Sequence, residues 1–550
     1  MNTYKFDCGC ELEITNCDIK PCDGLPGIKI DYENIPLDCP ATWDLIQSGH
    51  TKGIFQLETN LGRSWSKKSL PTDLTELSAL ISIMRPGVLK AMVDGKSMAS
   101  HYCDRKNVID EVKYFHDSLE PILNDTYGVL LFQEQSTKIA MDIAGFSPQR
   151  GEVLRKIIGK KQADKMAEIK SEFINGAAKV GKVTKEEAEE IFGWIEKGQR
   201  YLFCRAHAVG YGLLGYWSAY VKAHFPLHFY ASWLYYSHEK MDPQEEMQLL
   251  ISDARYFNID INPPSLDRLY NGDIGHFSLH KDGVFFGIGD IKRIGKSIVD
   301  KIIQNVELVE NKIGRKLKDW SWQDFLIHFS DKITTTAING LISTGAVDYI
   351  DSNSRQYKLH EYGIWKKLTK KEQEWIQDNC TNEPFDILLR NLIDNKSRLS
   401  VTRKGKLEDL IKMLKTPSYS LEDQAHVIAS KETELLGVPL TCSKLDTCDN
   451  KYMANTTCKE FLDGKSGKMT IAVEIIDSNE YIIKKGQMKG QKMMFLTGED
   501  ETASIESIIV FPRTLENKEP FLIKGSTVVL NGNRDKQRSD SFIVENITQI

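Results

Sequence analysis

The apolar residues of this chain change their spacing at about residue 465. In LTELSALISIM (74–84) and KEEAEEIFGWIEKG (185–198) they recur every three or four residues, which predicts amphipathic helices. From about residue 465 apolar and polar residues alternate instead, with turn residues between the short runs. A helical spacing does not suit a strand, nor an alternating spacing a helix, so the chain must combine a helical part with a separate all-β part.

The length of the chain indicates several domains. It has 550 residues, and about 150 residues per domain predicts three or four domains. We predict a multidomain α+β protein. Its regions are a small Cys-rich start (1–35), a mostly helical region (36–240), a region with a glycine turn (241–350), a charged helical linker (351–464) and a C-terminal all-β region that fits an OB-fold (465–550).

Composition is ordinary for a soluble globular protein, with 41% hydrophobic and 27% charged residues. No apolar run reaches the roughly 18 residues of a membrane span, and the N-terminus has no secretory pattern. The 11 cysteines are spread along the chain, which indicates reduced thiols in a cytoplasm. We therefore expect a cytoplasmic location and no membrane partner.

The net charge of −6 hides a local positive stretch. Residues 149–182 contain nine Lys or Arg residues and four acids. Nucleic-acid enzymes need such local stretches rather than a basic chain overall. A solvated helix face with ion pairs one turn apart would have the same composition.

Three motifs place phosphate-binding residue types inside apolar, helix-forming segments. They are TYGVLLFQEQ (126–135), LRKIIGKK (154–161) and Arg205-Ala206-His207-Ala208. At these residues the chain resembles the fingers region of the C-family replicative DNA polymerases, the alpha subunits of bacterial DNA polymerase III and their phage relatives. The resemblance runs from about residue 36 to about residue 350, where it includes LISTGAVD (341–348). It resumes weakly at KETELLGVPL (431–440) and in the C-terminal strands.

The resemblance implies a DNA-directed DNA polymerase that adds deoxynucleotides to a primer 3′ end, in a bacterial or phage-infected host cytoplasm. Positive groups aimed at phosphate charge are often the largest catalytic contribution in such chemistry. The nucleotide-binding residues that it implies are Gln133, Gln135, Arg155, Lys156, Lys160, Lys161, Arg205 and His207, with Gln56 and Arg85 framing the nucleotide or primer. Cys204-Arg205-Ala206 stands where the family usually has Asn-Lys-Ser, and Gly151-Glu152 where it usually has Ala-Asp.

Two further segments are candidates for contacting DNA. Gly287, Gly289, Lys292 and Gly295 fit the turn of a helix-hairpin-helix, in which backbone N–H groups approach a phosphate; an ordinary glycine turn is the alternative. Lys484, Lys485 and Lys489, with Lys492, Tyr481 and Phe495, fit the groove of an OB-fold for single strands. Surface lysines and core aromatics are the alternative there.

This chain lacks most of the metal-binding carboxylates that a polymerase of this family needs. Polymerases transfer phosphoryl groups with two Mg²⁺ ions held by paired carboxylates, and the family has an Asp-x-Asp pair in its palm. This chain contains no Asp-x-Asp. Tyr4-Lys5-Phe6-Asp7 resembles the segment of the third palm aspartate, so Asp7 is the candidate catalytic residue, although Cys8-Gly9-Cys10 after it departs from the family. We expect a second, palm-bearing polypeptide to supply the pair, or the chain to be a fragment.

The N-terminal cysteines are candidates for a structural zinc site. Cys8, Cys10, Cys17 and Cys22 form C-x-C-x6-C-x4-C, with Cys39 beyond. Four thiolates can hold Zn²⁺, but the spacing is not the usual paired C-x2-C. Free cysteines are the alternative.

Two classes of function are therefore open. The first is a polymerase, with primer-template DNA, deoxynucleoside triphosphates and a palm-bearing polypeptide as partners and a sliding clamp as a further candidate. The second is a non-catalytic DNA-binding subunit that uses the glycine turn and the OB-fold. LRKIIGKK and FQEQ favour the polymerase, because a module that only binds DNA has no need of triphosphate-binding residues.

Overall fold

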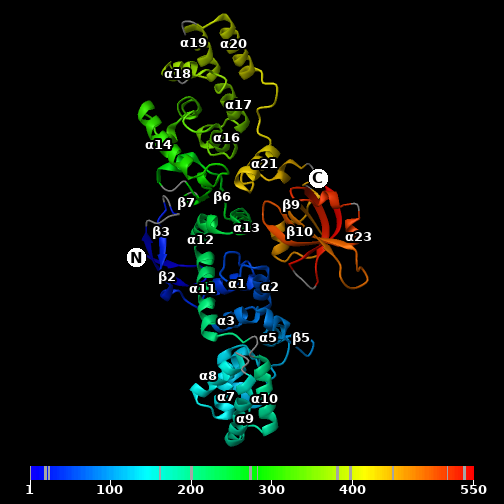
Figure 1. The fold of residues 1–550 in the computed structure, drawn as a ribbon. Helices are drawn as coiled ribbons and strands as arrows, with labels where there is room; N and C mark the ends of the chain where they lie inside the picture. Colours follow the sequence, from blue (N-terminus) through cyan, green and yellow to red (C-terminus); the bar gives the residue numbers. More distant parts are fainter. Residues whose placement is uncertain are drawn as a thin grey trace. The chain divides into compact units, whose positions relative to one another are not determined.

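The computed structural model describes residues 2–550 except 18–21, 23–24, 160–162, 199–201, 272–274, 282, 380–382, 396–398, 449–450, 452, 517 and 537–539. The chain divides into a first unit, Met1–Asn16 with Ile28–Pro226, and a second unit, Cys17–Gly27 with Leu227–Ile550. Figure 1 shows the elements of both units, coloured along the chain from blue at the N-terminus to red at the C-terminus. Within the described part, no helix is long and apolar enough to cross a membrane.

The first unit begins with a β-hairpin. Strand β1 (Asn2–Lys5) pairs antiparallel with β2 (Glu11–Cys17), and β3 (Gly27–Ile30) completes a sheet in the order β1-β2-β3. The hairpin turn closes through a 2.9 Å hydrogen bond from the Phe6 N–H to the Cys10 carbonyl. Gly9 has φ +86° in this turn, a conformation that a residue with a Cβ rarely adopts.

Short helices follow the hairpin and pack around α3. The elements are α1 (Pro40–Ser48), α2 (Asn60–Ser69), α3 (Leu74–Ile83), α4 (Pro86–Lys90), β4 (Met92–Val93), β5 (Lys96–Ser97), α5 (Met98–Lys106) and α6 (Glu120–Leu123). Residues 76–83 of α3 are all buried, and α3 packs against the long helix α11 (Arg205–His224). The predicted helix at 74–84 is confirmed.

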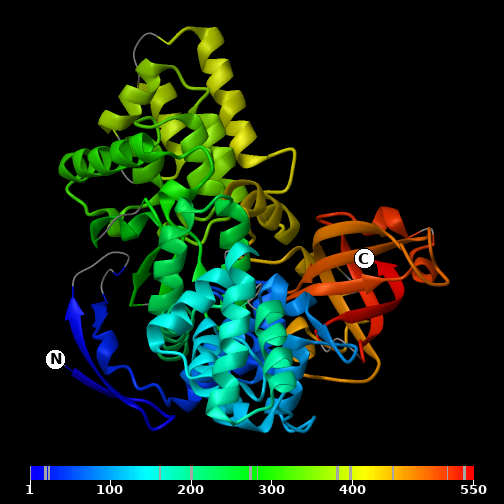
Figure 2. The same ribbon diagram turned by 60° about the horizontal axis from the view of Figure 1, so that its bottom comes forward.

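A helical subdomain lies between α6 and α11. Its helices are α7 (Gln133–Ala144), α8 (Pro148–Gly159), α9 (Ala163–Val180) and α10 (Lys185–Gly198), drawn in cyan to green in Figure 2. Their apolar faces share one core that includes Ile139, Leu154, Phe173 and Phe192. A capping box begins α10, because Thr184 Oγ1 accepts from the Glu187 N–H and Glu187 accepts from the Thr184 N–H.

The second unit contains a helical part and a small sheet. The helices are α12 (Pro226–Tyr235), α13 (Pro243–Tyr256), α14 (Lys296–Ile313), α15 (Trp322–Asp324), α16 (Thr335–Ser343), α17 (Arg355–Trp365), α18 (Lys370–Asn379), α19 (Phe385–Asn395), α20 (Val401–Lys415), α21 (Ala425–Leu436) and α22 (Cys458–Leu462). Strands β6 (Ile261–Asn262), β7 (Ser278–His280) and β8 (Gly283–Phe285) form a sheet in the order β6-β8-β7. The predicted helices of the charged region 351–430 are confirmed.

The C-terminal strands form a closed five-stranded barrel. They are β9 (Met469–Ile482), β10 (Lys492–Glu499), β11 (Ser504–Val510), β12 (Thr527–Arg534) and β13 (Phe542–Gln549), with helix α23 (Pro512–Leu515) between β11 and β12. The order around the barrel is β10-β11-β13-β12-β9; β11 and β13 are parallel and the other neighbours are antiparallel. Alternate residues such as Ile471, Val473 and Leu496 fill the core. Together with the helices, this barrel confirms the predicted multidomain α+β class.

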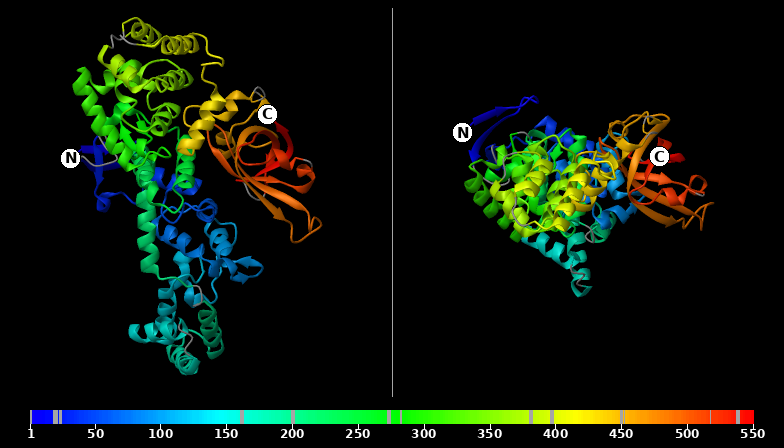
Figure 3. Two further views of the ribbon diagram at one scale, coloured as in Figure 1. Left: turned by 45° about the horizontal axis from the view of Figure 1, so that its top comes forward. Right: turned by 90° about the horizontal axis from the view of Figure 1, so that it is seen from above.

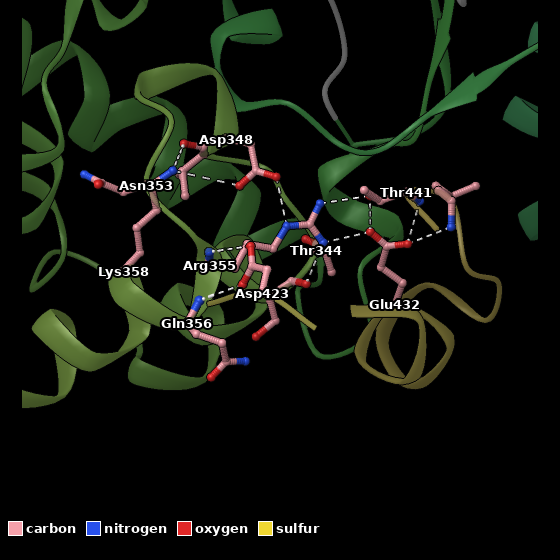
Figure 4. A network of polar contacts seen from close by, with 12 residues as sticks. Thr344, Asp348, Asn353, Arg355, Gln356, Lys358, Asp423, Glu432 and Thr441 are labelled. Atoms are coloured by element: carbon pink, nitrogen blue, oxygen red, sulfur yellow. Dashed lines mark hydrogen bonds and ion pairs between the residues drawn. The ribbon is translucent and has the colours of Figure 1, made fainter. Parts of the chain in front are cut away.

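A buried polar network joins two helices of the second unit and the segment after α16 (Figure 4). Arg355, only 4% exposed, donates to Asp348 at 2.8 Å, to Glu432 at 2.8 Å and to the Thr441 hydroxyl at 2.9 Å. The carboxylate of Glu432, which is 0% exposed, also accepts from the N–H groups of Leu440 at 2.6 Å and Thr441 at 2.8 Å. The network therefore ties α17 to α21 and to the residues after α16.

Candidate nucleotide-binding site

The site is built where two distant segments run side by side. Phe132 and Phe203 form an isolated parallel bridge, in which the Phe203 N–H donates to the Leu131 carbonyl at 2.9 Å. The Gln133 N–H in turn donates to the Phe203 carbonyl at 2.9 Å. The bridge therefore brings the start of α7 beside the start of α11, so two of the three motifs meet.

Gln133 and Arg155 connect this junction to the third motif. Gln133 donates to the Leu202 carbonyl at 3.3 Å and accepts from Arg155 Nη1 at 2.7 Å. Arg155, on α8, also makes a two-pronged ion pair with Glu152, at 2.6 Å and 2.7 Å. These hydrogen bonds from Arg155 hold the pKa of Glu152 below its ordinary value. The arginine is thus held in place by a carboxylate that a bound phosphate would have to displace.

Lys156 lies beside the same carboxylate and is exposed. Its ammonium is 3.6 Å from Glu152, and its side chain is 58% exposed, so this pair is weak. The other two basic residues predicted for the site, Lys160 and Lys161, lie outside the described residues.

Arg205 is the first residue of α11 and is also paired with an acid. Its guanidinium is 2.6 Å from Asp125, and it lies over the Phe132 ring at 5.3 Å. The Glu134 carboxylate accepts from the Arg205 N–H at 2.9 Å and 3.0 Å. A carboxylate at this position complements the partial positive charge of a helix N-terminus.

A row of aromatic rings links the remaining predicted residues. Arg85 lies over the Phe203 ring at 4.5 Å, and the exposed His207 is 5.3 Å from the same ring. His207 also contacts Tyr211 at 4.0 Å, and Tyr211 contacts Phe55 at 5.1 Å. Gln56, next to Phe55, is exposed in a turn with φ +66°. The structure therefore brings most of the predicted residues to one surface of the first unit.

Gln135 does not lie on this surface, so its expected role in nucleotide binding is wrong. It is 3% exposed, its amide oxygen accepts from the N–H groups of Leu131 and Phe132 at 3.0 Å, and its NH₂ donates to Thr126 at 2.8 Å. A buried amide whose bonding capacity is used internally has no group left for a ligand. Gln135 instead shapes the loop that precedes Gln133.

Sequence reasoning missed the acids that hold the arginines, namely Asp125 and Glu134. Glu152 was visible only as a departure from the family, although its three-residue spacing from Arg155 is typical of a helical ion pair. Phe203, Tyr211 and Phe55 gave no signal, because single aromatic residues in apolar segments are common in protein cores.

Where a helix-hairpin-helix was predicted, a single 3₁₀ turn stands in place of a first helix. Strand β8 is followed by one 3₁₀ turn, Ile288–Asp290, and then by α14. A Cβ at Gly287 would overlap the backbone of His276, and one at Gly289 the backbone of Gly275, so these two glycines serve internal packing. Lys292 and Gly295 are exposed at the turn before α14, and the Lys292 N–H donates to the Leu435 carbonyl at 2.8 Å.

The predicted lysines of the barrel share one hairpin tip. Lys484, Lys485 and Lys489 are exposed between β9 and β10, a hairpin that projects from the barrel in Figure 3. Lys492 differs, because its ammonium lies 3.0 Å from Glu480 and 3.5 Å from Glu519. Tyr481 and Phe495 contact each other edge to face at 6.1 Å near the same tip.

The N-terminal cysteines group differently from the prediction. Cys8, Cys39 and His224 place their ligand atoms within 4.8 Å of one another, whereas Cys10, Cys17 and Cys22 are not part of this group. The predicted set of Cys8, Cys10, Cys17 and Cys22 is corrected on this point. Asp7 is exposed in the hairpin turn, next to Cys8.

Comparison with known proteins agrees with the predicted resemblance. Residues 19–181 match the model of the bacterial DNA polymerase III alpha subunit finger domain. Over these residues the chain is therefore similar to the fingers region of a C-family replicative polymerase, and the similarity to the alpha subunits continues beyond them.

The relatives are bacterial DNA polymerase III alpha subunits. The subunit of Aquifex aeolicus is 29% identical over 94% of this chain and 43% of its own length. That of Thermus aquaticus is 32% identical over 60% of this chain and 26% of its own length. That of Escherichia coli is 26% identical over 92% of this chain and 40% of its own length. The chain thus spans less than half of each of these relatives.

Proposed function

We propose that the chain is the fingers and DNA-binding part of a DNA-directed DNA polymerase, which adds deoxynucleotides to a primer 3′ end. The observation that carries this proposal is the meeting of Gln133, Arg155 and Arg205 at one junction. Each comes from a different motif, and a module that only binds DNA does not require all three together. The similarity to DNA polymerase III alpha subunits supports the same conclusion.

In this proposal the basic residues bind the incoming triphosphate. Arg155 and Arg205 exchange their carboxylate partners, Glu152 and Asp125, for phosphate oxygens, which bring more negative charge and accept paired N–H donors equally well. Arg85 and His207 frame the nucleotide or primer from the Phe203 side. Gln56 and Lys156 are exposed at the margins of this surface.

The Mg²⁺ ions that promote nucleotide addition would need ligands from another polypeptide. Mg²⁺ takes oxygen ligands in near-octahedral geometry. Among the described residues, the group close enough to share an ion consists of two thiols and an imidazole, which do not suit Mg²⁺. A palm-bearing polypeptide would supply the aspartates, and this chain would add the carboxylate of Asp7 from its hairpin turn.

Primer extension tests the proposal. We expect the purified chain to bind primed DNA but not to extend it with Mg²⁺ and all four nucleotides. Adding the palm-bearing polypeptide encoded beside it should restore extension. Extension by the chain alone would contradict the need for a separate palm. A complex that binds DNA yet neither extends primers nor binds nucleotide would favour the second class, a non-catalytic DNA-binding subunit.

We also propose that the barrel is an OB-fold that binds single-stranded DNA. Its five closed strands and the order β10-β11-β13-β12-β9 support this fold. The Lys292–Gly295 turn before α14 is proposed to contact duplex phosphates, because it exposes a lysine at the start of a helix.

Replacing Lys484, Lys485 and Lys489 together with alanine should weaken single-strand binding and its salt dependence. Each lost phosphate contact removes roughly 0.7 from the slope of log K against log salt, so the slope should fall by up to about 2. Fluorescence anisotropy of the full chain with a labelled oligonucleotide at several salt concentrations measures this. Lys492→Ala is the control, because that lysine is already paired with acids. An unchanged slope in the triple variant would place the single strand elsewhere.

A further inference from the structure

Three soft ligand groups, from Cys8, Cys39 and His224, meet in the first unit away from the candidate nucleotide-binding site, and Cys10 lies in the same turn as Cys8. Cys8 and Cys10 lie at the tip of the β1–β2 hairpin, in the turn that Gly9 closes. Cys39 caps the N-terminus of α1 and is fully buried. His224 is the last residue of α11. The groups therefore come from three segments that are far apart in the sequence.

The distances between these groups suit a single metal ion. The sulfurs of Cys8 and Cys39 are 3.8 Å apart, and Cys39 Sγ is 3.1 Å from His224 Nε2. Sulfurs bound to one tetrahedral Zn²⁺ at about 2.3 Å lie about 3.8 Å apart. A disulfide would bring them to about 2 Å, so the two cysteines are placed as co-ligands rather than as a bonded pair.

Cys10 completes the group as a fourth ligand. It lies two residues from Cys8 in the same hairpin turn, and its thiol is beside those of Cys8 and Cys39. A cation among closely spaced sulfurs offsets the repulsion between their negative charges.

We propose that Cys8, Cys10, Cys39 and His224 bind one structural Zn²⁺ ion in a closed tetrahedral site. Three thiolates and one imidazole are a common zinc ligand set, and soft sulfur ligands select Zn²⁺ over Mg²⁺ or Ca²⁺. Four protein ligands leave no position for water or substrate, so the ion is structural.

The surroundings of His224 fit this role. The Phe6 ring lies 4.1 Å from the imidazole and the Tyr220 ring 4.4 Å, so both shield it from solvent. Nε2 faces Cys39, so the ring already points its ligand atom into the group.

The ion would hold the far end of α11. This helix carries Arg205 and His207 at its N-terminus and His224 at its C-terminus. A zinc ion that joins α11 to α1 and to the hairpin fixes the helix against the rest of the first unit. The proposal rests on these ligands alone and does not depend on the polymerase assignment.

Metal analysis of the full chain tests the proposal. We expect about one zinc per chain by plasma mass spectrometry, as for a closed four-ligand site. Cys10→Ser and His224→Asn should each lose most of this zinc. Cys17→Ser and Cys22→Ser are the matched controls and should keep it. Loss in these controls, with retention in Cys10→Ser and His224→Asn, would overturn the proposal in favour of a site built on Cys17 and Cys22.

Cobalt substitution keeps the test informative if a variant does not fold. The unaltered chain, freed of metal and loaded with Co²⁺, should show thiolate-to-cobalt charge transfer and the intense visible bands of tetrahedral cobalt. Its thermal unfolding temperature should fall when a chelator removes the metal and recover when Zn²⁺ is returned. A folded chain that contains no zinc and gives no thiolate–cobalt spectrum would refute the site.

Discussion

Replacing Arg355 with alanine should destabilise the second unit by about 3–5 kcal/mol, the usual cost of breaking a buried ion pair from one side. The substitution would leave Glu432 fully buried without its guanidinium partner, and Asp348 without its 2.8 Å hydrogen bond. A buried charge without a partner is far more costly than an exposed one. The N–H groups of Leu440 and Thr441 would then be the main support for the Glu432 carboxylate.

Urea unfolding of the full chain, followed by fluorescence and circular dichroism, measures this effect. The transition of the second unit should move to lower urea while that of the first unit stays in place. Lys431→Ala is the control: its pair with Glu434 lies on the same helix α21 but is about half exposed on both sides, so its loss should cost less than about 1 kcal/mol. Equal shifts in the two variants would mean that the Arg355 network contributes little to stability.

The Arg355 network also shows that motifs shared with a family do not reveal the ion pairs that their residues make. LISTGAVD and KETELLGVPL resemble the polymerase family, and the structure places Asp348 of the first and Glu432 of the second on the same arginine. Neither motif predicted this, because the arginine lies in the charged region 351–430, to which the sequence assigned no chemistry. An ion pair between distant segments depends on tertiary packing that local patterns do not encode.

Periodicity predicted the secondary structure well where one face of an element is buried. The helices at 74–84 and 185–198 and the strands after residue 465 all follow from the spacing of apolar residues. Side-chain environment was harder to predict. Gln133 and Gln135 are two residues apart on α7, which turns them by about 200° around the helix, so one reaches Arg155 and the other is buried.

The cysteines were hard to group for a related reason. Cys8 and Cys10 share a hairpin turn, so their spacing was informative. Their partners Cys39 and His224 arrive through α1 and α11, and no sequence spacing links a residue at 39 to one at 224. Cys17 and Cys22 were closer in sequence but lie outside the group in the structure.

Arg155→Ala should lower kcat/KM for nucleotides about ten- to a hundredfold in the enzyme reconstituted with its palm. One charge-assisted hydrogen bond to phosphate contributes roughly 1.5–3 kcal/mol, and each 1.4 kcal/mol or so is tenfold. Steady-state primer extension with varied nucleotide measures this loss. Affinity for primed DNA should change little, because Arg155 lies at the junction with Gln133 rather than among the exposed lysines of the barrel.

Two further variants on the same helix make this prediction specific. Arg150→Ala removes an equal charge whose partner is Glu172 of α9, away from the junction, and should leave the kinetics nearly unchanged. Glu152→Gln should act in the opposite direction to Arg155→Ala and lower KM, because it removes the carboxylate that competes with phosphate for the guanidinium. If Arg155→Ala and Arg150→Ala weaken DNA binding alike and leave kcat/KM unchanged, α8 contacts the template backbone and Arg155 does not bind the nucleotide.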